Sequence, residues 1–266
     1  MRSEITRTVT LKLAPIAVAI ALVACGRPSA SAPAGETPTI PPGREGKIIR
    51  RGQDLVKNTK QLLPGNVTAE LNCASCHLLG DRPRRPLSFA GIYGQYPEFS
   101  QRTKHFVGLR DRVAECFFFS MNGEPPSYYG PDLIAIEAYI AFLSRGSPVG
   151  PAPPMVPSYA APKSKDLKAG AAIYGAQCAV CHGANGAGSA TAGFPPLWGP
   201  ASFNDRAGMD RMMPGFVQAN MPLGRGGTLT DQQVADVSAY ILSKPRPHFN
   251  TSKLTNISPL ELKFLE

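Results

Sequence analysis

The feature of this 266-residue sequence that most restricts its fold is a five-residue motif, C-x-x-C-H, that occurs twice. One copy covers residues 73–77 and the other covers residues 178–182. Two thiols in one turn can add to the two vinyl groups of a haem, and the histidine that follows then lies beneath the iron as its proximal ligand. One copy can arise by chance, but two in one chain predict two covalently bound haem c groups. The expected attachment residues are Cys73, Cys76, Cys178 and Cys181, and the expected proximal ligands are His77 and His182.

The remaining cysteines have other expected roles. The chain has six cysteines, which in an oxidising compartment would ordinarily suggest disulfides. Four of them belong to the two motifs, which leaves Cys25 and Cys116.

Residues 1–24 have the features of an export signal. Scattered positive charge precedes an apolar run over residues 13–24, which is too short to span a bilayer. The run ends at Ala24 followed by Cys25, and a small residue before cysteine at this place resembles the bacterial lipobox, in which the cysteine becomes the lipidated first residue. We expect a periplasmic lipoprotein anchored in the membrane only through Cys25. The alternative is an ordinary cleaved signal peptide.

Composition divides the rest of the chain into two small domains. Residues 25–46 are rich in Pro, Ser, Ala and Gly and are expected to form a disordered tether. A second Pro-rich stretch, residues 147–162, is expected to link one domain over residues 47–146 to another over residues 163–250. Residues 251–266 form a C-terminal tail.

The two domains repeat the same spacing. Cys116 follows Cys73 by 43 residues, and Met221 follows Cys178 by 43 residues. An Ala-Tyr-Ile triplet also recurs near the end of each domain. The sequence therefore contains an internal repeat, and the repeat places Cys116 and Met221 at equivalent positions.

Helix boundaries can be predicted from capping residues. Thr230 with Gln233 forms a capping box for a helix over 231–243, Pro131 suits the first turn of a helix that ends before Gly146, and Asp166 can cap a helix over 167–178. Most of the remainder lacks periodicity and is rich in Gly and Pro. The predicted fold is mainly α, with two tandem cytochrome c-like domains whose long loops each wrap one covalent haem.

Met221 is the expected distal ligand of the second haem. Its thioether stands beside Pro222, and His/Met ligation raises the haem potential to suit electron transfer. The alternative is a core methionine, with Met209, Met212 or Met213 as the ligand.

Cys116 is the expected distal ligand of the first haem. A thiolate donor lowers the haem potential, which is unsuitable for a simple electron carrier. The alternative is a buried inert thiol, with Met121 as the ligand five residues later.

Taken together, these residues resemble the dihaem thiosulfate dehydrogenases, which interconvert thiosulfate and tetrathionate in the bacterial periplasm. The resemblance covers both domains. It rests on the two haem motifs and on residues 96–99 (YPEF), Arg102, residues 111–123, residues 196–205 and residues 220–222 (NMP).

The resemblance implies a role for each candidate residue. Cys116 would be the distal ligand and the catalytic thiol of an active-site haem, and Met221 the ligand of an electron-exit haem. Arg85, Arg102 and Ser88 would belong to the substrate pocket, with Arg84 as an alternative to Arg85. The sequence departs from some relatives at Asn220, where they have lysine.

The charge pattern agrees with an anionic substrate. The sequence has a formal net charge of +9, and seven basic residues lie between the first motif and Cys116. Guanidinium groups suit sulfonate oxygens, although a solvated basic face is the alternative for any one of them. The seven basic residues are Arg82, Arg84, Arg85, Arg102, Lys104, Arg110 and Arg112. No pattern typical of nucleic-acid binding occurs.

The expected function is a periplasmic oxidoreductase that couples two thiosulfate ions to tetrathionate. Its two electrons would leave through the second haem to an external acceptor such as a small cytochrome c. The same site could also reduce tetrathionate, and we expect oxidation. The alternatives are a non-catalytic dihaem electron carrier and a dihaem subunit of a thiosulfate-oxidising multienzyme complex.

Overall fold

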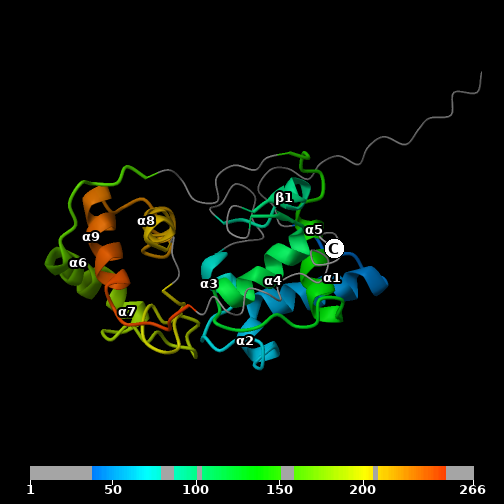
Figure 1. The fold of residues 1–266 in the computed structure, drawn as a ribbon, viewed down its shortest axis with the longest axis horizontal. Coiled ribbons are helices and arrows are strands. Elements are labelled where there is room, and N and C mark those ends of the chain that lie inside the picture. The colour runs from blue at the N-terminus through cyan, green and yellow to red at the C-terminus, as the bar shows by residue number, and fades with distance from the viewer. Residues whose placement is uncertain (1–37, 79–86, 101–103, 151–158, 206–208, 250–266) are drawn as a thin grey trace, which may run out of the picture. The chain divides into compact units, whose positions relative to one another are not determined.

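A computed structural model describes residues 38–78, 87–100, 104–150, 159–205 and 209–249. Regular structure in these ranges is almost entirely helical, as predicted (Figure 1). The chain forms two helical halves, one before and one after residues 151–158.

The first half is built on two longer helices at its ends. Its helical segments are α1 (Gly43–Lys57), α2 (Thr59–Leu62), α3 (Cys73–Cys76), η1 (Tyr93–Gln95), α4 (Leu109–Phe119) and α5 (Pro131–Leu143). A short antiparallel pair, β1 (Glu98–Phe99) and β2 (Phe106–Val107), precedes α4.

Helix α1 begins at Gly43, inside the segment predicted as a tether. Pro42 is its N-cap residue, and Glu45 lies in its first turn. Proline is tolerated at the start of a helix because the first N–H groups have no partner in the helix, and an acidic residue there interacts favourably with the helix dipole. The prediction that the tether extends to residue 46 was therefore wrong at its end, because a helix begins at Gly43.

The second half presents its haem-binding motif differently. Its helical segments are α6 (Leu167–Ile173), the π-helical turn η2 (Tyr174–Cys178), α7 (Ala179–His182), α8 (Met209–Asn220) and α9 (Asp231–Leu242). Segments α6, η2 and α7 follow one another without a break. The second C-x-x-C-H motif is therefore the end of one continuous helical run.

The predicted caps are present. Asp166 Oδ1 accepts hydrogen bonds from the N–H groups of Lys168 and Ala169 at 2.8 and 3.1 Å. Thr230 Oγ1 accepts a bond from the N–H of Gln233 at 3.3 Å, which starts α9.

In each half the first helix packs against the last, α1 against α5 and α6 against α9 (Figure 1). A glycine lies at each contact. A Cβ on Gly52 of α1 would lie 2.0 Å from the carbonyl oxygen of Ala135 in α5. A Cβ on Gly170 of α6 would lie 2.1 Å from the carbonyl oxygen of Asp236 in α9. Both are far inside van der Waals contact, so only glycine allows the two backbones to approach this closely.

Apolar side chains fix these helices around the crossing. Leu133 and Ile136 of α5 and Leu55 of α1 belong to the apolar core and are almost fully buried. In the second half Val234 and Val237 of α9 are fully buried. Within the residues that the structure describes, no helix is long and apolar enough to cross a membrane.

The crossing in the second half can be tested by adding one methyl group. Gly170→Ala should lower the free energy of unfolding of the holoprotein by about 1–3 kcal/mol, because the methyl group meets the Asp236 carbonyl. Its melting temperature should fall accordingly. Gly175→Ala, in the same helical run, is the matched control, because nothing lies within 4 Å of its added Cβ. Differential scanning calorimetry measures both, and equal melting temperatures would contradict the close contact.

Candidate functional site

The first C-x-x-C-H motif forms a single helical turn, α3. Asn72 precedes it, and the N–H of Asn72 donates to Ser75 Oγ at 3.0 Å. His77 follows as the C-cap residue. The turn therefore places two thiols and an imidazole on a short, capped piece of backbone.

The ring of His77 is held by a backbone carbonyl. Its Nδ1 lies 2.7 Å from the carbonyl oxygen of Leu87, and its ring stacks on Phe89 with 4.2 Å between ring centroids. Burial lowers the pKa of His77 to about 4, so the ring is neutral near pH 7. Because a carbonyl can only accept, Nδ1 carries the proton, and the lone pair of Nε2 is free to bind iron.

The second motif repeats this arrangement with different partners. Nδ1 of His182 lies 2.9 Å from the carbonyl oxygen of Pro195, and burial lowers the pKa of His182. The same tautomer follows, with Nε2 free. A backbone carbonyl that fixes the ring is the usual support of a histidine that binds a metal.

The cysteines of both motifs also fit covalent haem. Among the described residues, Cys73, Cys76, Cys178 and Cys181 form no disulfide. Two thiols, a neutral histidine with a free Nε2 and the same order in both halves are the groups that haem c requires. The residues present therefore fit two haems.

Cys116 lies on α4, and Arg112 lies one helical turn earlier on the same helix. Nη1 of Arg112 lies 3.5 Å from Cys116 Sγ and 3.3 Å from Glu115 Oε2. The charge of Cys116 is the largest cause of the raised pKa of Arg112, and burial opposes it. The cysteine therefore lies beside a fixed positive charge.

Two further residues are electrostatically coupled to this thiol. The pKa of the Cys73 thiol is raised to about 12, mainly by burial and also by the charge of Cys116. Burial raises the pKa of Tyr96, the charge of Arg112 opposes this increase, and the charge of Cys116 adds to it. The electrostatics of Cys116 are therefore coupled to Arg112, to Tyr96 and to a thiol of the first motif.

Arg110 has a different environment from Arg112. Its Nε donates to Glu137 Oε2 at 2.8 Å, and its guanidinium lies 5.5 Å from the centre of the Tyr128 ring. Its charge is therefore largely compensated by a carboxylate of α5. Of the two arginines on α4, Arg112 is the one beside Cys116.

Met221 follows directly after α8, and its N–H donates to the carbonyl of Val217 at 2.9 Å. Its side chain is half-buried, as is that of Met212. Met213 packs into the core with 7 % of its surface exposed. Met121, the alternative ligand of the first haem, is 3 % exposed in the core. We propose Cys116 and Met221 as the two distal ligands.

The remaining predicted residues are placed as follows. Ser88 Oγ accepts a bond from the N–H of Ala90 at 3.0 Å, one residue after the Leu87 carbonyl that holds His77. Outside the described residues lie Cys25, Arg84, Arg85 and Arg102.

The predicted set of catalytic residues omitted Arg112 and Tyr96. A signal for Arg112 is present in the sequence, because a residue four positions before Cys116 lies on the same face of a helix. Tyr96 belongs to a motif that carries the resemblance, but no local pattern connects it with Cys116.

Comparisons with known proteins agree with this geometry. Residues 65–149 match the SoxA/TsdA cytochrome c domain, and residues 167–245 match the cytochrome c domain. The thiosulfate dehydrogenase of Allochromatium vinosum is 37 % identical over 222 residues, which is 79 % of this chain and 82 % of that protein. That of Stutzerimonas stutzeri is 37 % identical over 78 % of this chain and 70 % of its own length.

A solved structure has the same fold. It is the thiosulfate dehydrogenase TsdBA of Marichromatium purpuratum in its as-isolated form, with a TM-score of 0.71 and 34 % identity over 78 % of this chain. The chain spans about half of that longer protein, 48 % of its length.

The fold and the two motifs define a dihaem c-type cytochrome with two covalent haem c groups. Each haem belongs to one of the two cytochrome c domains. The similarity over most of both sequences further shows that the chain belongs to the thiosulfate dehydrogenase family.

The proposed ligand of the second haem can be tested against its neighbour on α8. Met221→Leu should lower the reduction potential of one haem and remove the absorption band of methionine-bound ferric haem, because thioether ligation raises the potential. Met213→Leu keeps a core side chain of similar volume and should change neither property. Spectroscopic redox titration measures both. An unchanged reduction potential in Met221→Leu would show that another residue is the distal ligand of the second haem.

Proposed function

We propose that this chain oxidises two thiosulfate ions to one tetrathionate at the first haem, with Cys116 as the reacting thiol. The observation that carries the proposal is the placement of the Arg112 guanidinium 3.5 Å from Cys116 Sγ. A cysteine beside a fixed cation can react as a thiolate and can also receive an anion. A simple electron carrier needs neither property.

Charge repulsion is the main obstacle to the reaction. Two ions of charge minus two that approach to ~4 Å repel by about 4 kcal/mol in water, and by more inside a protein. Arg112 offsets part of this repulsion, and its planar guanidinium can donate two parallel hydrogen bonds to a sulfonate. Arg85 and Arg102 are the further cations proposed for the pocket.

The chemistry at Cys116 divides the reaction into two steps. In the first, the thiolate sulfur of Cys116 bonds to the outer sulfur of one thiosulfate, and two electrons leave. In the second, the outer sulfur of another thiosulfate attacks that bound sulfur, tetrathionate forms, and the Cys116 thiolate is released. Covalent attachment lowers the negative charge that the second thiosulfate meets.

When bound, the two haems would supply acceptors for the two electrons, one electron each. His77 and Cys116 would hold the iron of the first haem, and His182 and Met221 that of the second. A thiolate lowers and a thioether raises the potential, so electrons pass favourably from the first half to the second. An external acceptor, such as a small cytochrome c, then receives them.

We also propose that the protein acts in the periplasm and is anchored by a lipid on Cys25. The support is the apolar run over residues 13–24 that ends in Ala24 before this cysteine. Mass spectrometry of the N-terminal peptide from a native membrane fraction should find a lipidated Cys25. An unmodified Cys25 in a soluble fraction would exclude the anchor.

The central experiment compares wild type with Cys116→Gly in a steady-state assay. Thiosulfate is the substrate, ferricyanide is the acceptor, and tetrathionate is the product that is quantified. Wild type should form tetrathionate and the variant should form none detectable, because the covalent step has no sulfur to use. Mass spectrometry of both proteins confirms that two haems remain attached.

A second arm of this experiment tests the cation. Arg112→Gln should raise the KM for thiosulfate by roughly 10–100-fold, which corresponds to loss of one hydrogen bond to a charged group. Arg112→Lys should recover part of the affinity, and Arg110→Gln should leave KM unchanged, because Arg110 is paired with Glu137.

If wild type with two reducible haems forms no tetrathionate, the protein is instead an electron carrier or a subunit of a larger complex.

A further inference from the structure

The two haem-binding motifs are supported in different ways. The second motif ends a continuous helical run, so the helix itself positions Cys178. The first motif lies on the separate turn α3, and residues 63–72 divide it from α2. The N–H groups at the start of a helix have no partners within that helix, so α3 needs partners from elsewhere.

The partner at the start of α3 is the hydroxyl of Thr59. Its Oγ1 accepts a hydrogen bond from the N–H of Cys73 at 3.0 Å and donates to the carbonyl oxygen of Leu55 at 2.7 Å. The same oxygen lies 3.3 Å from Cys73 Sγ. Thr59 has no exposed surface, so water cannot replace these bonds.

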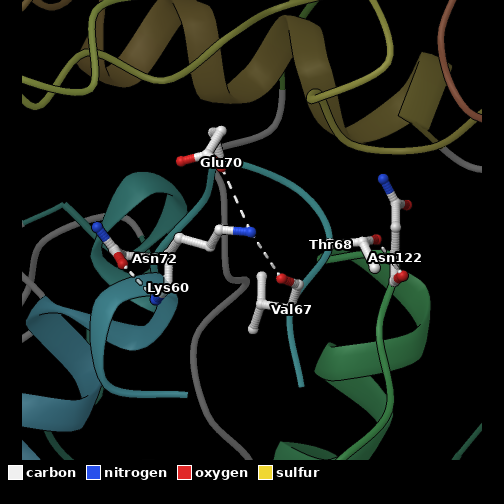
Figure 2. A network of polar contacts seen from close by, with 6 residues as sticks. All are labelled: Lys60, Val67, Thr68, Glu70, Asn72 and Asn122. Atoms are coloured by element: carbon white, nitrogen blue, oxygen red, sulfur yellow. Dashed lines mark hydrogen bonds and ion pairs between the residues drawn. The ribbon is translucent and has the colours of Figure 1, made fainter. Parts of the chain in front are cut away.

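Asn72 makes a second link between α2 and the same turn. Its Oδ1 accepts a bond from the N–H of Lys60 at 2.9 Å (Figure 2). The ammonium group of Lys60 donates to the carbonyl oxygen of Val67 at 2.9 Å and lies 3.3 Å from Glu70 (Figure 2). The backbone and the side chain of Lys60 thus connect the loop over residues 63–72 to α2.

We propose that Thr59, assisted by Asn72, is a positioning residue for attachment of the first haem. The hydroxyl of Thr59 holds the backbone and sulfur of Cys73 in the place that the helical run provides for Cys178 in the second half. Its loss leaves the Cys73 N–H buried without a partner, and the turn that carries both thiols becomes less ordered.

The reaction that depends on this order is the addition of a thiol to a haem vinyl group. The S–H bond of Cys73 breaks, a C–S bond forms at one vinyl carbon, and the hydrogen ends on the other. No electron is gained or lost overall. Addition at Cys76 follows the same balance, so both thioethers require α3 to keep its two sulfurs in fixed positions.

The test counts covalent haems on each motif. In Thr59→Val, the valine side chain has nearly the same volume as threonine but cannot form a hydrogen bond. The fraction of chains with haem on the first motif should fall roughly fivefold, the change expected from loss of one ordinary hydrogen bond. Mass spectrometry of the denatured chain and of its haem peptides measures each motif, and the second motif should stay fully occupied.

Three variants separate positioning from general damage. Thr59→Ser keeps the hydroxyl and should restore the first haem. Thr68→Val makes the same chemical change in the loop between α2 and α3, where the hydroxyl instead donates to the carbonyl of Asn122 at 2.5 Å, and should keep both haems. Asn72→Ala, at a half-buried position, should lower occupancy of the first motif and serves if Thr59→Val does not accumulate.

The outcomes are distinct from those of the thiosulfate assay, because no substrate is used. Full occupancy of the first motif in Thr59→Val would overturn the proposal. So would equal loss of haem from both motifs, which would indicate a general folding defect. If Thr59→Val does not accumulate, full occupancy in Asn72→Ala would overturn it.

Discussion

A hydrogen bond from each proximal histidine to a backbone carbonyl is the interaction on which both haem sites depend. Leu87 and Pro195 supply these carbonyls, from loops that follow the motifs. The bond fixes the tautomer and aims Nε2, the nitrogen that would hold the iron. The loops that supply these carbonyls are therefore part of the haem sites.

The same frame serves two different purposes in the two halves. Both have a first helix that meets the last at a glycine, Gly52 or Gly170, and both present a thiol pair followed by histidine. The halves differ at the distal position, where we propose Cys116 and Met221. In this proposal, a change of one sulfur ligand on a repeated scaffold would separate the reacting haem from the haem that exports electrons.

The sequence predicted what depends on local side-chain chemistry. The caps at Asp166 and Thr230 and the haem motifs were identified from residue type and spacing, because their bonds span a few residues. The glycine crossings and the carbonyl partners of the histidines were not predicted, since a backbone group has no sequence signature. Arg110 and Arg112 were likewise indistinguishable until α5 placed Glu137 beside the first of them.

The ion pair between Arg112 and Glu115 has a consequence for turnover. Glu115 is almost fully buried, with 1 % of its surface exposed, and it lies 3.3 Å from the guanidinium beside Cys116. A carboxylate so placed limits how tightly any anion can be held. Because the product is itself a dianion, an uncompensated cation would retain it. With Arg112 as the proposed anion-binding cation, the internal carboxylate would favour product release, at the cost of some affinity for the substrate.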